Sequence, residues 1–96
     1  MSKYRIGVMN VEAITFDELV AYGLQNAGAH IHNGMPWSFE YKGRRITHET
    51  DDWYLVDTVF GTMNMKKGDM LVSDWKGELY HIGIDFFEKH YTKILD

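Results

Sequence analysis

The pattern of apolar and polar positions in residues 1–26 predicts a strand followed by a helix. Residues 4–14 are rich in β-favouring side chains and predict one strand, with Gly7 as a candidate bulge. From Thr15 onward the apolar positions recur every three to four residues, which is typical of one face of a helix. Thr15 and Glu18 have the spacing of a capping box, in which each side chain bonds the other residue's backbone N–H. The helix is expected to end near Asn26.

The middle of the chain predicts an irregular segment and then a β-hairpin. Residues 27–36 contain two glycines and the only proline, so an extended loop is expected there. Residues 37–41 and 44–48 flank Lys42-Gly43, which is the spacing of a two-residue hairpin turn. In the first arm the aromatic residues fall on alternate positions, as expected for a strand with one face packed against a core.

Short strands separated by turns are predicted in the second half of the chain. After a turn at residues 49–52, residues 53–60 predict a strand with Trp53, Leu55 and Val59 among its core residues. The further strands, separated by glycine-containing turns, are expected at residues 62–65, 70–73 and 78–84.

A C-terminal helix completes the predicted fold. Asp85 and Glu88 repeat the capping-box spacing and predict a short helix that runs to about His90. Together the elements predict a single α+β domain over residues 1–96: a small, strongly bent antiparallel sheet or partly open β-barrel, with one main helix and this short C-terminal helix. A chain of 96 residues has too little apolar surface for a second core. Self-association would bury more of that surface, so a homo-oligomer is left open.

Composition and charge narrow the class of protein. The chain has no cysteine, which excludes disulfides and thiolate metal sites. It has no apolar run of the roughly 18–20 residues that span a bilayer, and its N-terminus lacks the apolar block of a secretory signal, so a cytosolic protein without a membrane partner is expected. A net charge of −4 argues against open nucleic-acid binding, which relies on neutralising several phosphates. A compact anionic ligand in a local basic pocket, or a basic protein partner, remains compatible with this charge.

Aromatic and basic side chains around the predicted hairpin are candidates for a nucleotide site. Arginine forks bind phosphate oxygens bidentately, and aromatic rings stack on bases. Because neighbouring residues of a strand point to opposite faces, Arg44 and Arg45 cannot easily serve one site, whereas Lys42 and Arg44 can. The alternative is that the aromatic residues form the core and the basic residues a solvated turn. The candidate ligand-binding residues are Trp37, Tyr41, Lys42, Arg44, Arg45, Trp53 and Trp75.

Trp75, in the predicted turn at residues 74–77, is also a candidate contact for a protein partner or a second copy of the chain. A tryptophan at a hairpin tip is costly to expose to water and commonly anchors a partner. Met63 and Met65 share one face of a short predicted strand and extend this interpretation. The alternative is that Trp75 folds back over the sheet.

No catalytic or cofactor-binding signature is present, so neither an enzyme nor a cofactor is expected. His30 and His32 would face the same side of an extended segment and could share a metal, but no HExxH pattern or diagnostic carboxylate–histidine spacing accompanies them. Asp51 and Asp52 stand where a β-turn favours aspartate. The glycines form no phosphate-binding loop, and no serine lies in a nucleophile elbow. No metal site is therefore expected.

The C-terminal run KKGDMLVSDWKGELYHIGIDFFEKHYTKI resembles small bacteriophage and prophage proteins of the PGDYG family. The opening KYRIGVMNVEAITF and the segment MPWSFEYKGRRITHETDDWYLV are also similar to phage proteins. Lys67 stands where the family has proline, and His81-Ile82-Gly83 replaces its Pro-Cys-Lys. The shared motifs are turns and a helix start, so the resemblance assigns no functional residue. The matching positions are Gly68-Asp69, Gly77-Glu78, Tyr80, Asp85, Phe87-Glu88-Lys89 and Tyr91.

The resemblance implies a phage accessory protein that acts in the host cytoplasm by binding and neutralising a host component. The leading hypothesis is an anti-defence protein that sequesters a host-derived, nucleotide-type signal, in the manner of a sponge. The alternative is an inhibitor that occludes a host defence protein by presenting acidic and aromatic residues to a basic surface. A small metal-dependent phosphodiesterase using His30 and His32, and a structural protein of the virion, are further alternatives.

Overall fold

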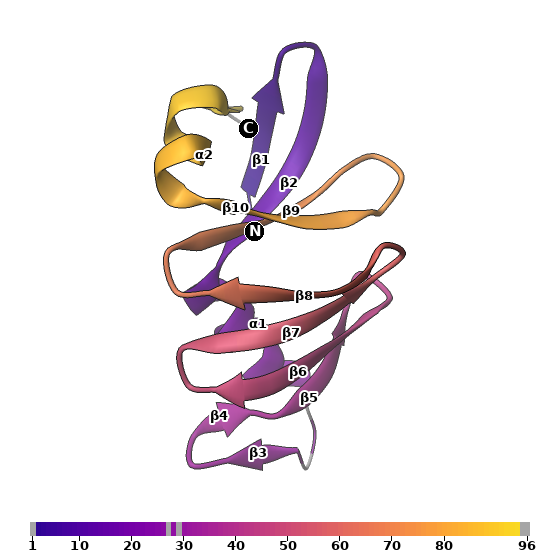
Figure 1. The fold of residues 1–96 in the computed structure, drawn as a ribbon, viewed down its shortest axis with the longest axis vertical. Coiled ribbons are helices and arrows are strands. Elements are labelled where there is room, and N and C mark those ends of the chain that lie inside the picture. Colours follow the sequence, from indigo (N-terminus) through magenta and orange to yellow (C-terminus); the bar gives the residue numbers. More distant parts are fainter. Residues whose placement is uncertain (1, 27, 29, 95–96) are drawn as a thin grey trace.

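Eleven strands and two helices form the part of the chain that the computed structural model describes, residues 2–26, 28 and 30–94 (Figure 1). The expected α+β class is confirmed, with antiparallel sheets, one main helix and a short C-terminal helix. In chain order the elements are β1 (Ser2–Ile6), β2 (Met9–Thr15), α1 (Phe16–Asn26), β3 (Ile31–His32), β4 (Met35–Pro36), β5 (Ser38–Tyr41), β6 (Arg44–Thr50), β7 (Trp53–Thr58), β8 (Gly61–Lys66), β9 (Asp69–Ser73), β10 (Leu79–Gly83), α2 (Ile84–His90) and β11 (Thr92–Lys93).

Two antiparallel sheets make up the body of the fold. One has five strands in the order β10-β9-β2-β1-β11, and the other has four strands in the order β5-β6-β7-β8. A turn at Lys67-Gly68 carries the chain from the four-stranded sheet into the five-stranded sheet. Within the described residues no strand pairing joins these two sheets, so they do not close into a barrel there. The expectation of a partly open barrel stays a prediction.

Helix α1 begins at the expected capping box. The N–H of Thr15 donates a hydrogen bond to Glu18 Oε1 (3.0 Å), and the N–H of Glu18 donates to Thr15 Oγ1 (3.1 Å). The bond from the Thr15 N–H lowers the pKa of the Glu18 carboxyl below its ordinary value. The apolar face of the helix buries Phe16, Leu19 and Gly23. The local sequence therefore fixes the start of α1, and its apolar face fixes its packing.

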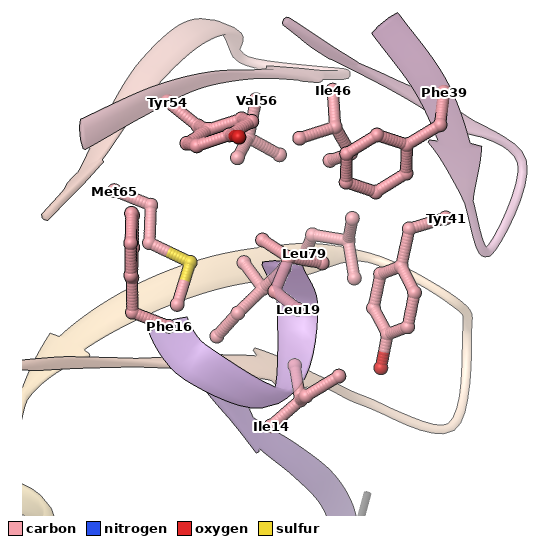
Figure 2. Packing of buried hydrophobic residues seen from close by; sticks show 11 residues of the cluster. Ile14, Phe16, Leu19, Phe39, Tyr41, Ile46, Tyr54, Val56, Met65 and Leu79 are labelled. Carbon is pink, nitrogen blue, oxygen red and sulfur yellow. The ribbon is translucent and has the colours of Figure 1, made fainter. Parts of the chain in front are cut away.

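The main hydrophobic cluster joins α1 to the facing sides of both larger sheets (Figure 2). A second cluster lies between the five-stranded sheet and Phe87 of α2. Strand β9 contributes to both, because Leu71 belongs to the main cluster while Met70 and Val72 belong to the second. A strand covered on both faces is apolar throughout, which explains the run MLV. The main cluster consists of Ile14, Phe16, Leu19, Phe39, Tyr41, Ile46, Tyr54, Val56, Met65, Leu71 and Leu79.

The segment predicted as one strand, residues 4–14, is instead a hairpin. Strands β1 and β2 pair antiparallel, with Ile6 opposite Met9, and Gly7 stands in the turn with a φ of 58°. Val8 at the tip is 98% exposed. Both arms are rich in β-favouring residues, and Gly7 alone reads equally as a bulge or as a turn, so the pattern did not separate the two strands.

Part of the loop expected at residues 27–36 also forms a hairpin. Ile31 pairs with Pro36 and His32 pairs with Met35, around a turn in which Asn33 and Gly34 have φ values of 52° and 78°. Asn-Gly is a favoured pair for a two-residue hairpin turn, because both of its central residues tolerate positive φ. The signal was thus present in the sequence. Residues 27 and 29 of the expected loop lie outside the described part of the chain.

Strand β7 buries the face opposite to the predicted one. Tyr54 and Val56 are both 0% exposed, whereas Trp53 and Leu55 are half-buried on the other face. Val59 is 55% exposed in the turn between β7 and β8. The predicted core residues of this strand are therefore wrong. Both faces of β7 carry large apolar side chains, so alternation alone does not select the buried face.

The C-terminal helix forms without its expected cap. Gly83 is the N-cap residue of α2, and no side chain of the described residues makes a capping hydrogen bond there, so the predicted capping box at Asp85 and Glu88 is wrong. The helix is held by packing instead: the ring of Phe87 is buried and meets the ring of Tyr4 edge-on, with centroids 4.6 Å apart. Strand β11, which was not predicted, follows it and pairs with β1.

Candidate functional site

The seven predicted ligand-binding residues do not converge on one site. They lie in the core, beside the β3–β4 hairpin, on the solvent-facing side of the four-stranded sheet and in two separate hairpin turns. A pocket made from all of them therefore does not form within one chain. Where each residue lies decides which of them remain available to a ligand or partner.

Tyr41 belongs to the core and offers no surface to a ligand. It is 1% exposed, and its ring meets the ring of Tyr22 edge-on with centroids 5.1 Å apart. Burial is the main cause that raises the pKa of its hydroxyl, and the charge of Glu12 adds to it. The prediction that Tyr41 stacks on a ligand is corrected by this burial. Burial in the core was the alternative expected for the aromatic residues of this hairpin.

Trp37 is used within the fold. Its indole ring stacks on the imidazole of His48, with centroids 4.6 Å apart and 12° between the planes, and the ring of His32 lies 4.9 Å away. The His48 side chain is 7% exposed, and its Nε2 lies 2.8 Å from Asp51 Oδ1. Its Nδ1 is buried without a hydrogen-bond partner among the described residues. One face of Trp37 is thus closed to a ligand, although the residue remains 41% exposed.

Tyr54, on β7, supports the stack of Trp37 on His48. Its hydroxyl donates a hydrogen bond to the carbonyl oxygen of Pro36 (2.7 Å), and its ring meets the imidazole of His48 edge-on at 5.3 Å. Burial raises the pKa of Tyr54 to about 12. These contacts tie the β3–β4 hairpin to the four-stranded sheet. Because Trp37 stacks on His48 within them, Trp37 has a structural role.

Arg45 and Trp53 share the solvent-facing side of the four-stranded sheet. Arg45 Nη1 donates a hydrogen bond to Ser38 Oγ (3.0 Å), and its Nη2 lies 3.6 Å from Glu40 Oε1. Trp53 is half-buried on β7. Arg44 is adjacent to Arg45 on β6, so it points to the opposite face, where it is half-buried. The expectation that the two arginines serve different faces agrees with this arrangement.

Trp75 lies at the tip of the β9–β10 hairpin and is 75% exposed. The tip is fixed by Asp74, whose Oδ1 accepts hydrogen bonds from the N–H of Lys76 (2.9 Å) and of Glu78 (3.0 Å). Gly77 completes the turn with a φ of 82°, a backbone conformation that favours glycine. The ammonium of Lys76 lies 5.2 Å from the centre of the indole ring. The chain thus presents this tryptophan to solvent from an ordered turn.

A hollow of about 220 Å³ lies beside this tip and is named here the Trp75 hollow. Glu12, on β2, lies in its wall, and Glu12 Oε2 lies 3.2 Å from Lys42 Nζ in the β5–β6 turn. In Figure 1 the β5–β6, β7–β8 and β9–β10 turns all point to the same side of the molecule. Two predicted site residues, Lys42 and Trp75, therefore come to one region. The hollow is lined by Lys3, Asn10, Val11, Glu12, Ser73, Asp74 and Trp75.

Lys3, Asn10 and Glu12 were missed by the sequence prediction of the site. They lie on the β1–β2 hairpin and reach Trp75 only because β2 pairs with β9, with Glu12 opposite Ser73. A pairing between segments so far apart in sequence leaves no local signal. The one available hint was Glu12 itself, a charged residue within the apolar run of β2.

The acidic turn that contains Asp51 and Asp52 lies away from Trp75. Figure 1 shows the β6–β7 turn, which carries Asp51 and Asp52, on the side opposite to the β9–β10 tip. Asp51 lies against His48, and Asp52 Oδ1 lies 3.5 Å from Lys67 Nζ. The expected β-turn at these aspartates is confirmed. They cannot form one binding surface with Trp75.

The remaining expectations concern methionines, metals and membranes. Met65 is 0% exposed and Met63 packs against the main cluster. The prediction that these methionines extend an exposed contact surface is therefore wrong. Among residues 2–26, 28 and 30–94, no group of three or more His, Asp or Glu side chains is arranged to hold a metal ion. Across the same part of the chain, no helix is long and apolar enough to cross a membrane.

Comparison of the chain with protein-family models, with curated proteins and with solved structures finds no match. The likeness to phage proteins therefore remains a prediction from the sequence.

Proposed function

We propose that this protein acts by binding another protein at the Trp75 hollow and occluding a basic surface of it. The observation that carries the proposal is the 75% exposure of Trp75 on a turn that Asp74 holds in place. An ordered, exposed tryptophan loses little conformational freedom on binding and offers a large apolar surface, which is typical of the residues that anchor interfaces.

The energies favour contact with a partner over the contact that the free protein makes. Burying the exposed part of the Trp75 indole contributes about 3 kcal/mol at 25 cal/mol per Å². The exposed cation–π contact with Lys76 contributes only about 0.5–1 kcal/mol. A partner that covers the indole can therefore displace Lys76 from the ring.

The net charge of the chain favours a basic partner. The wall of the hollow carries the carboxylates of Glu12 and Asp74 and the ammonium of Lys3, while Lys42 pairs with Glu12 and Lys76 lies against the indole. The whole chain has a net charge of −4, which speeds encounter with a basic surface. Because Asp51 and Asp52 lie on the opposite side, Glu12 and Asp74 take the acidic role in this proposal. If the resemblance to phage proteins holds, the partner is a protein of the bacterial host.

Site-specific photo-crosslinking in bacterial cells tests the proposal. A photoreactive aromatic residue at position 75 is expected to give a discrete crosslinked protein. The same residue at position 86 is the control, because Phe86 is 54% exposed on α2, away from the Trp75 hollow. Identical product patterns at both positions, or no product at position 75, would contradict the proposal. A Trp75→Ser variant should lose the partner in a pull-down, and a Phe86→Ser variant should keep it.

A nucleotide-type signal is the second candidate ligand, favoured by the position of Lys3 and Asn10 in a hollow walled by Trp75. A base can stack on the indole and a phosphate can meet an ammonium. At about 220 Å³ the hollow is smaller than the roughly 300 Å³ where ligand pockets usually begin, so it suits one base with its sugar. Titration with AMP, ADP-ribose and a cyclic dinucleotide, followed by tryptophan fluorescence in the wild type and Trp75→Phe, tests this candidate.

The virion role and the phosphodiesterase remain predictions. Turnover of a phosphodiester that disappears in His30→Ala or His32→Ala would replace binding as the function.

A further inference from the structure

The main cluster covers only one side of the four-stranded sheet, and the opposite side of these described strands is named here the outer face. The inner side carries Ile46, Tyr54, Val56 and Met65, all 0% exposed. The outer face alternates with it and is partly open to solvent. The outer face consists of Ser38, Glu40, Arg45, Thr47, Trp53, Leu55, Asp57, Thr62, Asn64 and Lys66.

The strand register arranges this face in rows across the sheet. Ile46 pairs with Val56. In the same register the next residues along the two middle strands, Arg45 and Asp57, lie side by side. Thr47 pairs with Leu55 in the row beside them. One row therefore carries Arg45 and Asp57 on its two middle strands, and the adjoining row carries Thr47 and Leu55.

We propose that the outer face binds the same face of a second copy of the chain, about a two-fold axis that runs between β6 and β7 and parallel to them. Rotation about this axis exchanges β6 with β7 while keeping each row at the same level. Arg45 of each copy then faces Asp57 of the other, at two symmetric positions. Such a face is complementary to itself, because both members of the pair come from one chain.

The shape of the face fits the same arrangement. A hollow of about 330 Å³ is lined by Arg45, Thr47, Leu55, Asp57 and Thr62. The rotation places Leu55 of the second copy over Thr47, within this hollow. Two sheets that pack face to face keep their strands within about 30° of each other and lie about 10 Å apart, which an axis parallel to the strands permits.

A second copy explains the charges better than a nucleic acid or an apolar peptide. The described side chains of this face include two cations, Arg45 and Lys66, and two anions, Glu40 and Asp57, so it lacks the excess positive charge that phosphates require. Arg45 already contacts Ser38 and Glu40, but its five donors leave capacity for a further carboxylate.

The dimer is expected to be weak. Strand spacing gives roughly 400 Å² of outer face per copy, against about 800 Å² per partner in a stable interface. Association should therefore depend on concentration and on salt, because the facing charge pairs are screened by ions.

Charge reversal with mixing tests the proposal. Analytical ultracentrifugation from about 10 μM to about 1 mM should show wild-type dimers toward the upper end. Arg45→Asp and Asp57→Arg should each weaken dimerisation by more than about tenfold, because each places like charges opposite one another at both symmetric positions. An equimolar mixture of the two variants should associate at least as tightly as the wild type, since every facing pair is then opposite in sign. A merely structural role for these residues would not produce this rescue.

Lys93→Glu is the matched control, because it changes the net charge as Arg45→Asp does but lies on β11. It should leave dimerisation unchanged. Circular dichroism first confirms that each variant is folded, and Leu55→Lys supplies a second test by placing a charge at the centre of the contact. A wild type that stays monomeric throughout overturns the proposal. It is equally overturned by variants that fail to pair on mixing, or by an unchanged dimerisation constant for Leu55→Lys.

Discussion

The indole of Trp37 lies parallel to the imidazole of His48, with ring centroids 4.6 Å apart and 12° between the planes. A tryptophan that composition suggests as a platform for a ligand is thus engaged by a residue of its own chain. His48 is in turn held by the carboxylate of Asp51, at 2.8 Å, and by the ring of Tyr54. Trp37 is therefore engaged within its own chain, whereas Trp75 is 75% exposed.

Replacing Trp37 should destabilise the fold, whereas replacing Trp75 should not. Trp37→Ala removes the stack on His48 and exposes the His48 imidazole to water, so we expect a loss of about 2 kcal/mol in the free energy of unfolding. Trp75→Ala should change it by less than about 0.5 kcal/mol, because the side chain is 75% exposed. Urea unfolding of both variants measures the difference. Equal losses would contradict the structural role of Trp37.

Gly23→Ala should destabilise the protein although alanine favours helices. A Cβ at position 23 would come within 2.5 Å of Phe39 Cε1 and 2.7 Å of Pro36 Cγ. Helix propensity would gain about 1 kcal/mol, but forcing the Phe39 ring from its place should cost about 1–3 kcal/mol more than that gain. Thermal unfolding tests the sign, with Gln25→Ala on the exposed side of α1 as the control. A raised melting temperature for Gly23→Ala would refute the close packing.

The capping box should lose stability in acid through Glu18. Its pKa is lowered from an ordinary value of 4.5, chiefly by the hydrogen bond from the Thr15 N–H. A lowered pKa contributes stability above the ordinary value, and this stability is lost as the pH falls through the folded-state pKa. Glu18→Gln should therefore cost about 0.5–1 kcal/mol at neutral pH and less in acid. Thr15→Ala should cost a similar amount at both, because its hydroxyl does not titrate in this range. Denaturant unfolding at each pH compares them.

Tyr54 should make the protein sensitive to alkali. Burial raises its pKa from 10.0 to about 12, so its contribution to stability is complete below pH 10 and is lost as the pH rises toward 12. Tyr54→Phe should cost about 1 kcal/mol at neutral pH, through the lost hydrogen bond to Pro36. The gap between wild type and variant should narrow above pH 10. Urea unfolding across this range measures the gap, and a constant gap would contradict the assignment.

Local signals in the sequence predicted several elements correctly because their determinants lie within a few residues. The capping box joins Thr15 to Glu18, and the Lys42-Gly43 turn joins β5 to β6, in each case through neighbouring backbone groups. The exposure of Trp75 could also be read locally, since a tryptophan within a tight turn has no sheet face to join. The Asn33-Gly34 hairpin carried an equally local signal that the nearby glycines and proline obscured.

The wrong predictions lie where two local interpretations fit the sequence pattern equally well. Either face of β7 could have been buried, and the choice of Tyr54 and Val56 depends on α1 and the five-stranded sheet lying on that side. Residues 4–14 could extend as one strand or fold back, and the hairpin is stabilised by pairing of β2 with β9. In both cases the contacts that decide the outcome come from distant segments, so the local sequence does not show them.

The sequence alone determined the α+β class, the start of α1 and the position of the main hairpin turns, because backbone hydrogen bonds and turn conformations depend on adjacent residues. Tertiary structure decided which faces are buried, which strands pair and which polar residues meet at Trp75. Those outcomes depend on burying apolar surface from distant segments together, and Glu12 reaches the Trp75 hollow only through β9.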